Sequence, residues 1–170
     1  PECYVDTNLI EYLLNAGVNH QHCCSKVVGQ LNTTFAERFA VGIIDKDKVE
    51  LGYIKECEPI AKTPHLTLLK HKERCQYLIT IAPAGDRFLL DCAEGLNVDP
   101  TRFEIPSDLK NFTKLSKSIT SNTDQRFKAL FSAIQEHEEI HCLRETLVYL
   151  CQKKYNADTA TLKKHFTTNS

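Results

Sequence analysis

The chain has 170 residues, of which 42% are hydrophobic and 25% are charged, a composition within the range of ordinary globular domains. Its net charge of -1 argues against a strongly basic nucleic-acid binder, and its longest apolar runs, such as residues 39–44, are too short to span a membrane. Without a signal-like pattern at the amino end, we expect one cytoplasmic domain over residues 1–170 that does not enter a membrane.

The eight cysteines contain no CxxC spacing, so we interpret them as reduced, half-buried thiols rather than as a zinc cluster. Charge is unevenly distributed along the chain. Residues 1–100 carry 10 Lys and Arg against 14 Asp and Glu, and residues 101–170 carry 11 against 8. An acidic front portion and a mildly basic back portion suit a metal site beside a phosphate-contacting surface.

The first half of the chain predicts alternating strands and helices. Residues 3–5 form a short apolar run that ends at Asp6, and we interpret it as a buried strand followed by a helix from Leu9. Residues 22–36 have helical spacing, and residues 40–44 predict a second strand, which ends at Asp45. The segment 49–65 predicts a short helix and then a loop.

Two further strands are predicted at residues 66–69 and 77–81, followed by a helix that Pro83 opens and Gly95 ends. The pattern is then helical, with helices expected near 107–118, 124–136, 139–154 and 158–165. These elements predict an α/β fold that is Rossmann-like. We expect a mostly parallel sheet of about four strands with helices on both faces (1–100) and a helical C-terminal part (101–170).

Acidic residues follow two of the predicted strands, Asp6 the first and Asp45 the second, with Asp47 two positions later. Functional groups in open α/β sheets collect beyond the carboxyl ends of strands, so these carboxylates are expected to meet. Converging carboxylates need a cation, and oxygen ligands suit Mg²⁺ or Mn²⁺, the ions of phosphoryl chemistry. The alternative is that the aspartates only cap helices and turns.

The sequence VGIIDKD at residues 41–47, together with an acid after an earlier strand, resembles the TOPRIM domain of topoisomerases, primases and OLD-type nucleases. That domain pairs a glutamate after its first strand with a DxD motif after a later one, and here Asp6 stands in place of the glutamate. OLD-type members also carry an acid after a proline, which Asp86 resembles. The resemblance implies a divalent-metal-dependent nuclease that works beside an ATPase, with the metal ligands Asp6, Asp45, Asp47 and Asp86.

A second family competes for the same residues. The sequence YVDTN at residues 4–8 resembles the opening strand of a PIN-domain ribonuclease, and DRFLLDCA at residues 86–93 resembles its later metal-binding helix. The DxD motif has no natural PIN counterpart at its position. Both resemblances imply Mg²⁺-dependent cleavage of a phosphodiester, so the reaction class is the same under either.

A zinc hydrolase is the alternative from another enzyme class, because HEEIH at residues 137–141 matches HExxH, in which His137 and His141 would bind zinc and Glu138 would act as base. Arg144 and Leu147 occupy positions where the longer form of the motif needs glycine and histidine, and the helical stripe changes phase here. Surface histidines near a helix junction are the simpler interpretation.

Three lysines, Lys110, Lys114 and Lys117, share one face of a predicted amphipathic helix and are candidates for contact with nucleic-acid phosphates. A solvated helix face is the common alternative. Asn19, His20 and His22 follow the first helix and are polar candidates without a motif of their own. The non-enzymatic hypothesis is a small α/β interaction module that regulates an ATPase partner.

Overall fold

The computed structural model describes residues 1–46 and 52–167. The described helices are α1 (Tyr4–Leu14), α2 (Cys24–Asn32), α3 (Gly52–Lys55), α4 (Gly85–Gly95), α5 (Leu109–Ser116), α6 (Gln125–Ile134), α7 (Glu138–Lys153) and α8 (Thr159–Phe166). Short 3-10 helices occupy Pro100–Phe103, Ile119–Asn122 and Lys154–Asn156. The strands are β1 (Ala40–Asp45), β2 (Cys57–Lys62), β3 (Leu66–His71) and β4 (Gln76–Ile81).

The four strands form one sheet in the order β1-β4-β3-β2. Its size matches the prediction, but only β1 and β4 pair in parallel, and the other two pairs are antiparallel. The expectation of a mostly parallel, Rossmann-like sheet is therefore wrong. The physical reason is connection length, because residues 63–65 and 72–75 are too short for the crossover that parallel neighbours need.

The predicted strand at residues 3–5 is also wrong, because these residues begin helix α1. Cys3 is the N-cap, and its Sγ accepts a hydrogen bond from the Asp6 N–H at 3.4 Å. Val5, Leu9 and Leu13 follow at helical spacing and are buried. The first turn of α1 therefore carries Asp6, which does not follow a strand.

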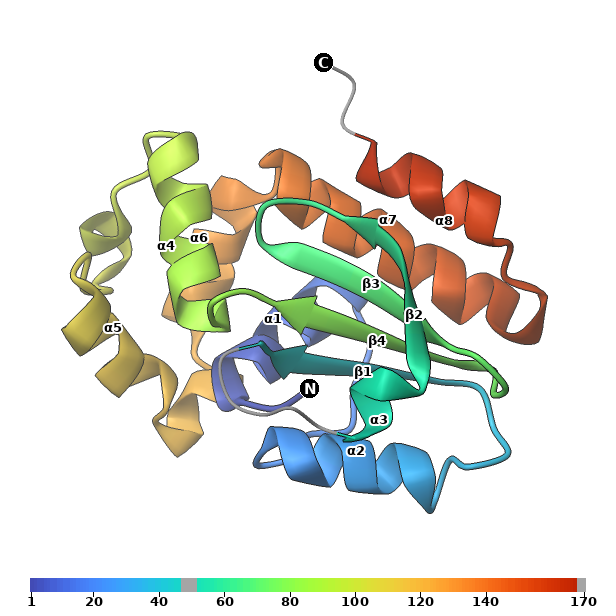
Figure 1. Cartoon of the computed structure of the whole chain (residues 1–170). Coiled ribbons are helices and arrows are strands. Elements are labelled where there is room, and N and C mark those ends of the chain that lie inside the picture. The colour runs from blue at the N-terminus through green and yellow to red at the C-terminus, as the bar shows by residue number, and fades with distance from the viewer. Residues whose placement is uncertain (47–51, 168–170) are drawn as a thin grey trace.

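Helices cover both faces of the sheet, as predicted (Figure 1). On one face, Ile44 and Leu78 pack with α2 and α3. On the other, Ile43 and Ile79 belong to a larger core with α1, α4, α6, α7 and α8. The part after Pro106 is helical, as expected, while β2 is a strand where the sequence predicted a loop.

Gln76, the first residue of β4, is fully buried and connects the sheet to the core that α2 and α3 form on one face. Its Nε2 donates to the carbonyl oxygens of Leu31 at 2.9 Å and Phe35 at 2.6 Å, and its Oε1 accepts from the Tyr53 hydroxyl at 2.8 Å. One amide thus joins β4 to α2, α3 and the turn that follows α2.

We predict that Gln76→Leu lowers the free energy of unfolding by about 2–4 kcal/mol, because two carbonyls and one hydroxyl lose their buried partner. Urea unfolding followed by circular dichroism measures the change. Tyr53→Phe removes only one of the three hydrogen bonds and is expected to cost about 1 kcal/mol. Equal stability of Gln76→Leu and the wild type would contradict this role.

Candidate acidic site at the start of helix α4

The parallel strands β1 and β4 end side by side, with Asp45 opposite Ile81 in the register. The chain leaves β4, passes through residues 82–84 and enters α4 at Gly85. This path places the first turn of α4 beside Asp45, whose Oδ1 accepts the Gly85 N–H at 2.8 Å. A carboxylate there satisfies an N–H that the helix cannot pair internally and lies at the positive end of its dipole.

Asp6 reaches the same glycine from the first turn of α1. A Cβ atom added to Gly85 would lie 2.2 Å from Asp6 Oδ1, so any other residue at position 85 would require the Asp6 carboxyl to move. The sequence predicted that Asp6 and Asp45 end neighbouring strands, and for Asp6 this is wrong, because it lies in the first turn of helix α1; both aspartates nevertheless lie beside Gly85. The Asp6 side chain is only 1% exposed, and neither carboxyl oxygen has a hydrogen-bond partner among the described residues.

Burial of Asp6 disfavours its charged form and raises its pKa to about 6; a contact with the Cys3 side chain opposes this rise, while the negative charges of Asp86 and Glu2 add to it. A buried carboxyl without a hydrogen bond is costly when ionised. The protein therefore keeps an energetically unfavourable group at the start of α4, and a nearby positive charge would relieve that cost.

Glu2 is a member of the site that the sequence analysis missed. Its side chain is 6% exposed, and its Oε2 accepts the Asp45 N–H at 3.1 Å. Had residues 3–5 been interpreted as the start of a helix, Glu2 would have been the acid directly before that helix. Asp86, predicted as a fourth acid, lies in the first turn of α4 and is half-buried.

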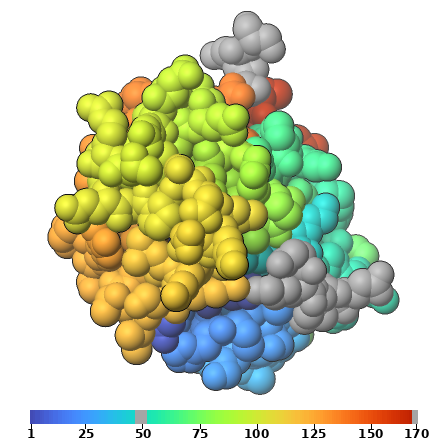
Figure 2. Space-filling model, turned by 90° about the vertical axis from the view of Figure 1, so that its left-hand side faces the viewer, coloured from blue at the N-terminus to red at the C-terminus, as the bar shows by residue number. Residues whose placement is uncertain are grey.

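A surface pocket of about 520 Å³ opens beside these acids between α4 and α5. Figure 2 faces the side of the molecule that carries these two helices, in yellow-green and yellow. Asp45 and Asp86 line the pocket together with Arg87 and Lys117, so acidic and basic groups share one cavity. Its remaining lining residues are Pro83, Ala84, Asp91, Leu109 and Thr113.

The three lysines predicted to contact phosphate differ in their position relative to the pocket. All three are exposed, but only Lys117, the C-cap of α5, lines the pocket, and Lys110 and Lys114 are absent from its lining. Asp47 lies outside the described residues. Within residues 1–46 and 52–167, no group of three or more His, Cys, Asp or Glu side chains is arranged to hold a metal ion.

A smaller pocket of about 210 Å³ also reaches Lys117, from the side of α1. Glu2, Tyr4, His20 and His22 line it, and the rings of Tyr4 and His20 stack with centroids 4.5 Å apart. The two histidines from the loop after α1 therefore do lie beside an acid of the site.

His65 supports the pocket through a chain of charged contacts. Its Nδ1 lies 2.5 Å from Glu139 Oε2 and its Nε2 lies 3.1 Å from Asp91 Oδ2, while the other Asp91 oxygen pairs with Arg87 Nη2 at 2.7 Å. Glu139 also accepts from the Thr63 hydroxyl and, at 2.9 Å, from the His65 N–H. This series of contacts links Glu139, at the buried start of α7, to the Arg87 guanidinium in the pocket.

These contacts shift two pKa values in opposite directions. Burial alone would lower the pKa of His65, but hydrogen bonds to Glu139 and Asp91 raise it above its usual value. Burial alone would raise the pKa of Glu139, but hydrogen bonds from Thr63 and His65 lower it. The pair is thus favoured as an imidazolium and a carboxylate.

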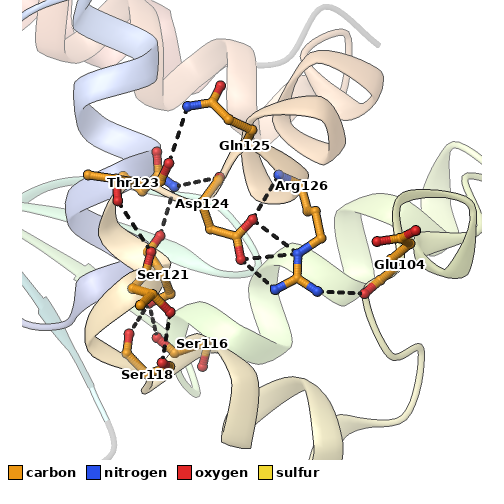
Figure 3. A network of polar contacts seen from close by, with 10 residues as sticks. Glu104, Ser116, Ser118, Ser121, Thr123, Asp124, Gln125 and Arg126 are labelled. Atoms are coloured by element: carbon orange, nitrogen blue, oxygen red, sulfur yellow. Dashed lines mark hydrogen bonds and ion pairs between the residues drawn. The ribbon is translucent and has the colours of Figure 1, made fainter.

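A second polar network holds α5 and α6 against α1 (Figure 3). The fully buried Asn8 donates from Nδ2 to the carbonyl oxygens of Ser121 at 2.8 Å and Asp124 at 3.2 Å. Ser121 Oγ in turn donates to the carbonyl oxygen of Ser116 at 2.5 Å. Asn8 lies two residues after Asp6, so this network ties the segment carrying Lys117 to the acidic site.

The HExxH segment does not form a zinc-binding helix face. His137 precedes α7 as its N-cap, and its Nδ1 accepts the Glu139 N–H at 3.2 Å. His141 lies one turn into α7 and is exposed. The expected helix junction is present, because α6 ends at Ile134 and α7 begins at Glu138.

No family model matches the chain, and neither a curated protein nor a solved structure is significantly similar to it. Among the described residues, no helix has both the length and the apolar character required to cross a bilayer.

We predict that Asp6→Asn raises the free energy of unfolding by roughly 1–3 kcal/mol at pH 7.5 without metal, because a buried charge is removed. The folded-state pKa of about 6 lies above the unfolded value. Asp6 therefore destabilises the wild type progressively as pH rises from about 4 to above 6. Urea unfolding at pH 4 and pH 7.5 should show a gain that is large only at pH 7.5. A pH-independent difference would contradict the prediction.

We predict that Glu139→Gln lowers the free energy of unfolding by about 2–4 kcal/mol near pH 5.5, because His65 loses its buried counter-charge. The Glu139 contribution is lost as pH falls through its lowered folded pKa, and the His65 contribution is lost as pH rises through its raised one. The stability difference should therefore be greatest between these limits. Glu138→Gln, at the exposed neighbouring position, is the matched control and should change stability little.

Proposed function

We propose that the acids at the start of α4 form the divalent-metal site of a nuclease that hydrolyses nucleic-acid phosphodiesters. The observation that carries the proposal is the buried Asp6 carboxyl, which lacks a hydrogen bond among the described residues and contacts the glycine that binds Asp45. A cation at this place would offset the charge of several acids at once. Oxygen donors of this kind suit Mg²⁺ or Mn²⁺.

The acids of the proposed site differ in whether they line the pocket. Asp45 and Asp86 line it, whereas Asp6 lies against Gly85, is absent from the lining and would contribute negative charge. Because the described residues do not contain a complete ligand set, the proposal requires Asp47, two positions after Asp45, to contribute a further carboxylate. The ion would polarise a phosphate oxygen and lower the pKa of a bound water.

The TOPRIM resemblance supports this proposal better than the PIN resemblance. Asp45, which has no natural PIN counterpart, is a central member of the site, and Glu2 lies against its backbone. A glutamate is the residue type that the TOPRIM domain pairs with DxD. We therefore propose that Glu2, rather than Asp6, takes the place of that glutamate, although Glu2 precedes helix α1 instead of following a strand.

We predict that saturating Mg²⁺ or Mn²⁺ raises the melting temperature of the wild type by about 5–10 °C over a sample in chelator, at a concentration a hundredfold above Kd. The Asp45→Asn, Asp47→Asn double variant should lose most of this rise, because neutral amides leave less charge for the ion to offset. With Mn²⁺, the wild type should nick single- or double-stranded DNA or RNA and the double variant should not.

The matched control is the Glu73→Gln, Glu94→Gln double variant, which removes the same charge from two exposed positions. It should keep both the metal-dependent rise and the cleavage. No response to metal together with no cleavage would overturn the nuclease proposal and favour the non-catalytic module that regulates an ATPase partner. Cleavage by the Asp45, Asp47 double variant would show that the catalytic site lies elsewhere.

A further inference from the structure

Two cations lie in the same pocket as the acids, and they come from different helices. Arg87 belongs to the first turns of α4, and Lys117 is the C-cap of α5. Lys117 follows Leu109 and Thr113 at four-residue steps, so these three side chains form the α5 wall of the pocket. A ligand in the pocket would therefore contact a positive group on either side.

The Arg87 side chain is held in position by an ion pair. Its Nη2 pairs with Asp91, and Asp91 is fixed in turn by the His65–Glu139 pair. Among the described residues, Arg87 makes no other hydrogen bond or ion pair, so the rest of its guanidinium fork is available. A guanidinium held along one edge is well suited to bind a phosphate through its other donors.

The charges of the pocket predict that an anion cannot bind alone. Asp45, Asp86 and Asp91 contribute three negative charges, and Arg87 and Lys117 contribute two positive ones. A divalent cation would change the sum of the lining from -1 to +1. Binding of a phosphate should consequently depend on the metal, with Arg87 and Lys117 contacting oxygens that the metal does not take.

The shape of the pocket favours an unpaired nucleotide over a duplex. Its volume of about 520 Å³ lies in the range of small-molecule sites, and Leu109, which is 42% exposed, provides apolar surface beside Pro83 and Ala84. A duplex presents only its backbone to such a pocket, whereas a single strand can place a base or sugar against apolar side chains.

We infer that the pocket between α4 and α5 binds an unpaired nucleotide of a single-stranded nucleic acid, with Arg87 and Lys117 holding its phosphate. The inference rests on the proposed function, of which it names the substrate class and two phosphate-binding residues. It assigns no role in binding to Lys110 and Lys114, which lie outside the pocket lining.

The test measures fluorescence anisotropy of a labelled single-stranded oligonucleotide and of a duplex of equal length, in Ca²⁺ and in chelator. Ca²⁺ replaces Mg²⁺ so that binding is observed with little cleavage. The wild type should bind the single strand at least tenfold more tightly in Ca²⁺ than in chelator, and more tightly than the duplex. Arg87→Gln and Lys117→Gln should each weaken binding about tenfold and reduce the salt dependence by about 0.7.

The matched controls are Arg144→Gln and Lys163→Gln, which remove the same charges from exposed positions on α7 and α8, outside the pocket. They should bind as the wild type does. Wild-type affinity in Arg87→Gln and Lys117→Gln would overturn the inference, as would equal binding of duplex. If metal still stabilises the protein and cleavage still needs Asp45 and Asp47, either result leaves the proposed function intact, so the two failures are distinguishable.

Discussion

The close contact of Asp6 with Gly85 is the constraint on which the arrangement of the acidic site depends. A side chain at position 85 would collide with the Asp6 carboxyl, and the Gly85 N–H binds Asp45. Gly85 therefore joins α1, β1 and α4 at one point. The cost of this junction is a buried carboxyl with a raised pKa. An ordinary helix cap does not need a second acid, and under the proposed function the second acid serves to attract a cation.

Two polar networks hold the walls of the pocket against this junction. The His65–Glu139 pair fixes Asp91, and through it Arg87, on the α4 side. On the α5 side, Asn8 binds the carbonyl oxygens that follow the helix and so anchors the region of Lys117 to α1. Each network includes a buried residue, Glu139 or Asn8, and reaches an exposed cation, Arg87 or Lys117. Such support is what a binding site needs if its charged groups are to keep their geometry.

The sequence predicted the parts of the fold that periodicity determines and missed those that tertiary contacts determine. Continuous apolar runs correctly predicted β1, β3 and β4. Residues 3–5 are apolar because α1 is buried around most of its surface, a pattern that a buried strand shares. Strand β2 was missed because Pro59 and the exposed polar residues Glu58 and Lys62 interrupt its apolar pattern, as edge strands allow. The strand-end position predicted for Asp45 is confirmed and the one predicted for Asp6 is wrong, while Glu2 and Arg87 were missed, since neither stands in a recognisable pattern.

In the proposed site, the buried Asp6 would attract a metal ion through its charge, whereas other acids would coordinate the ion. Asp45 and Asp86 reach the pocket, where they can exchange water for an ion or a phosphate. Asp6 is absent from the pocket lining and lies against Gly85. Water screens a charge poorly in such a place, so Asp6 acts on the pocket more strongly than an exposed aspartate would at the same distance. In the proposed site, Asp6 therefore increases the attraction for a cation without occupying any of its coordination positions, and those positions remain for Asp45, Asp47, Asp86 and the substrate.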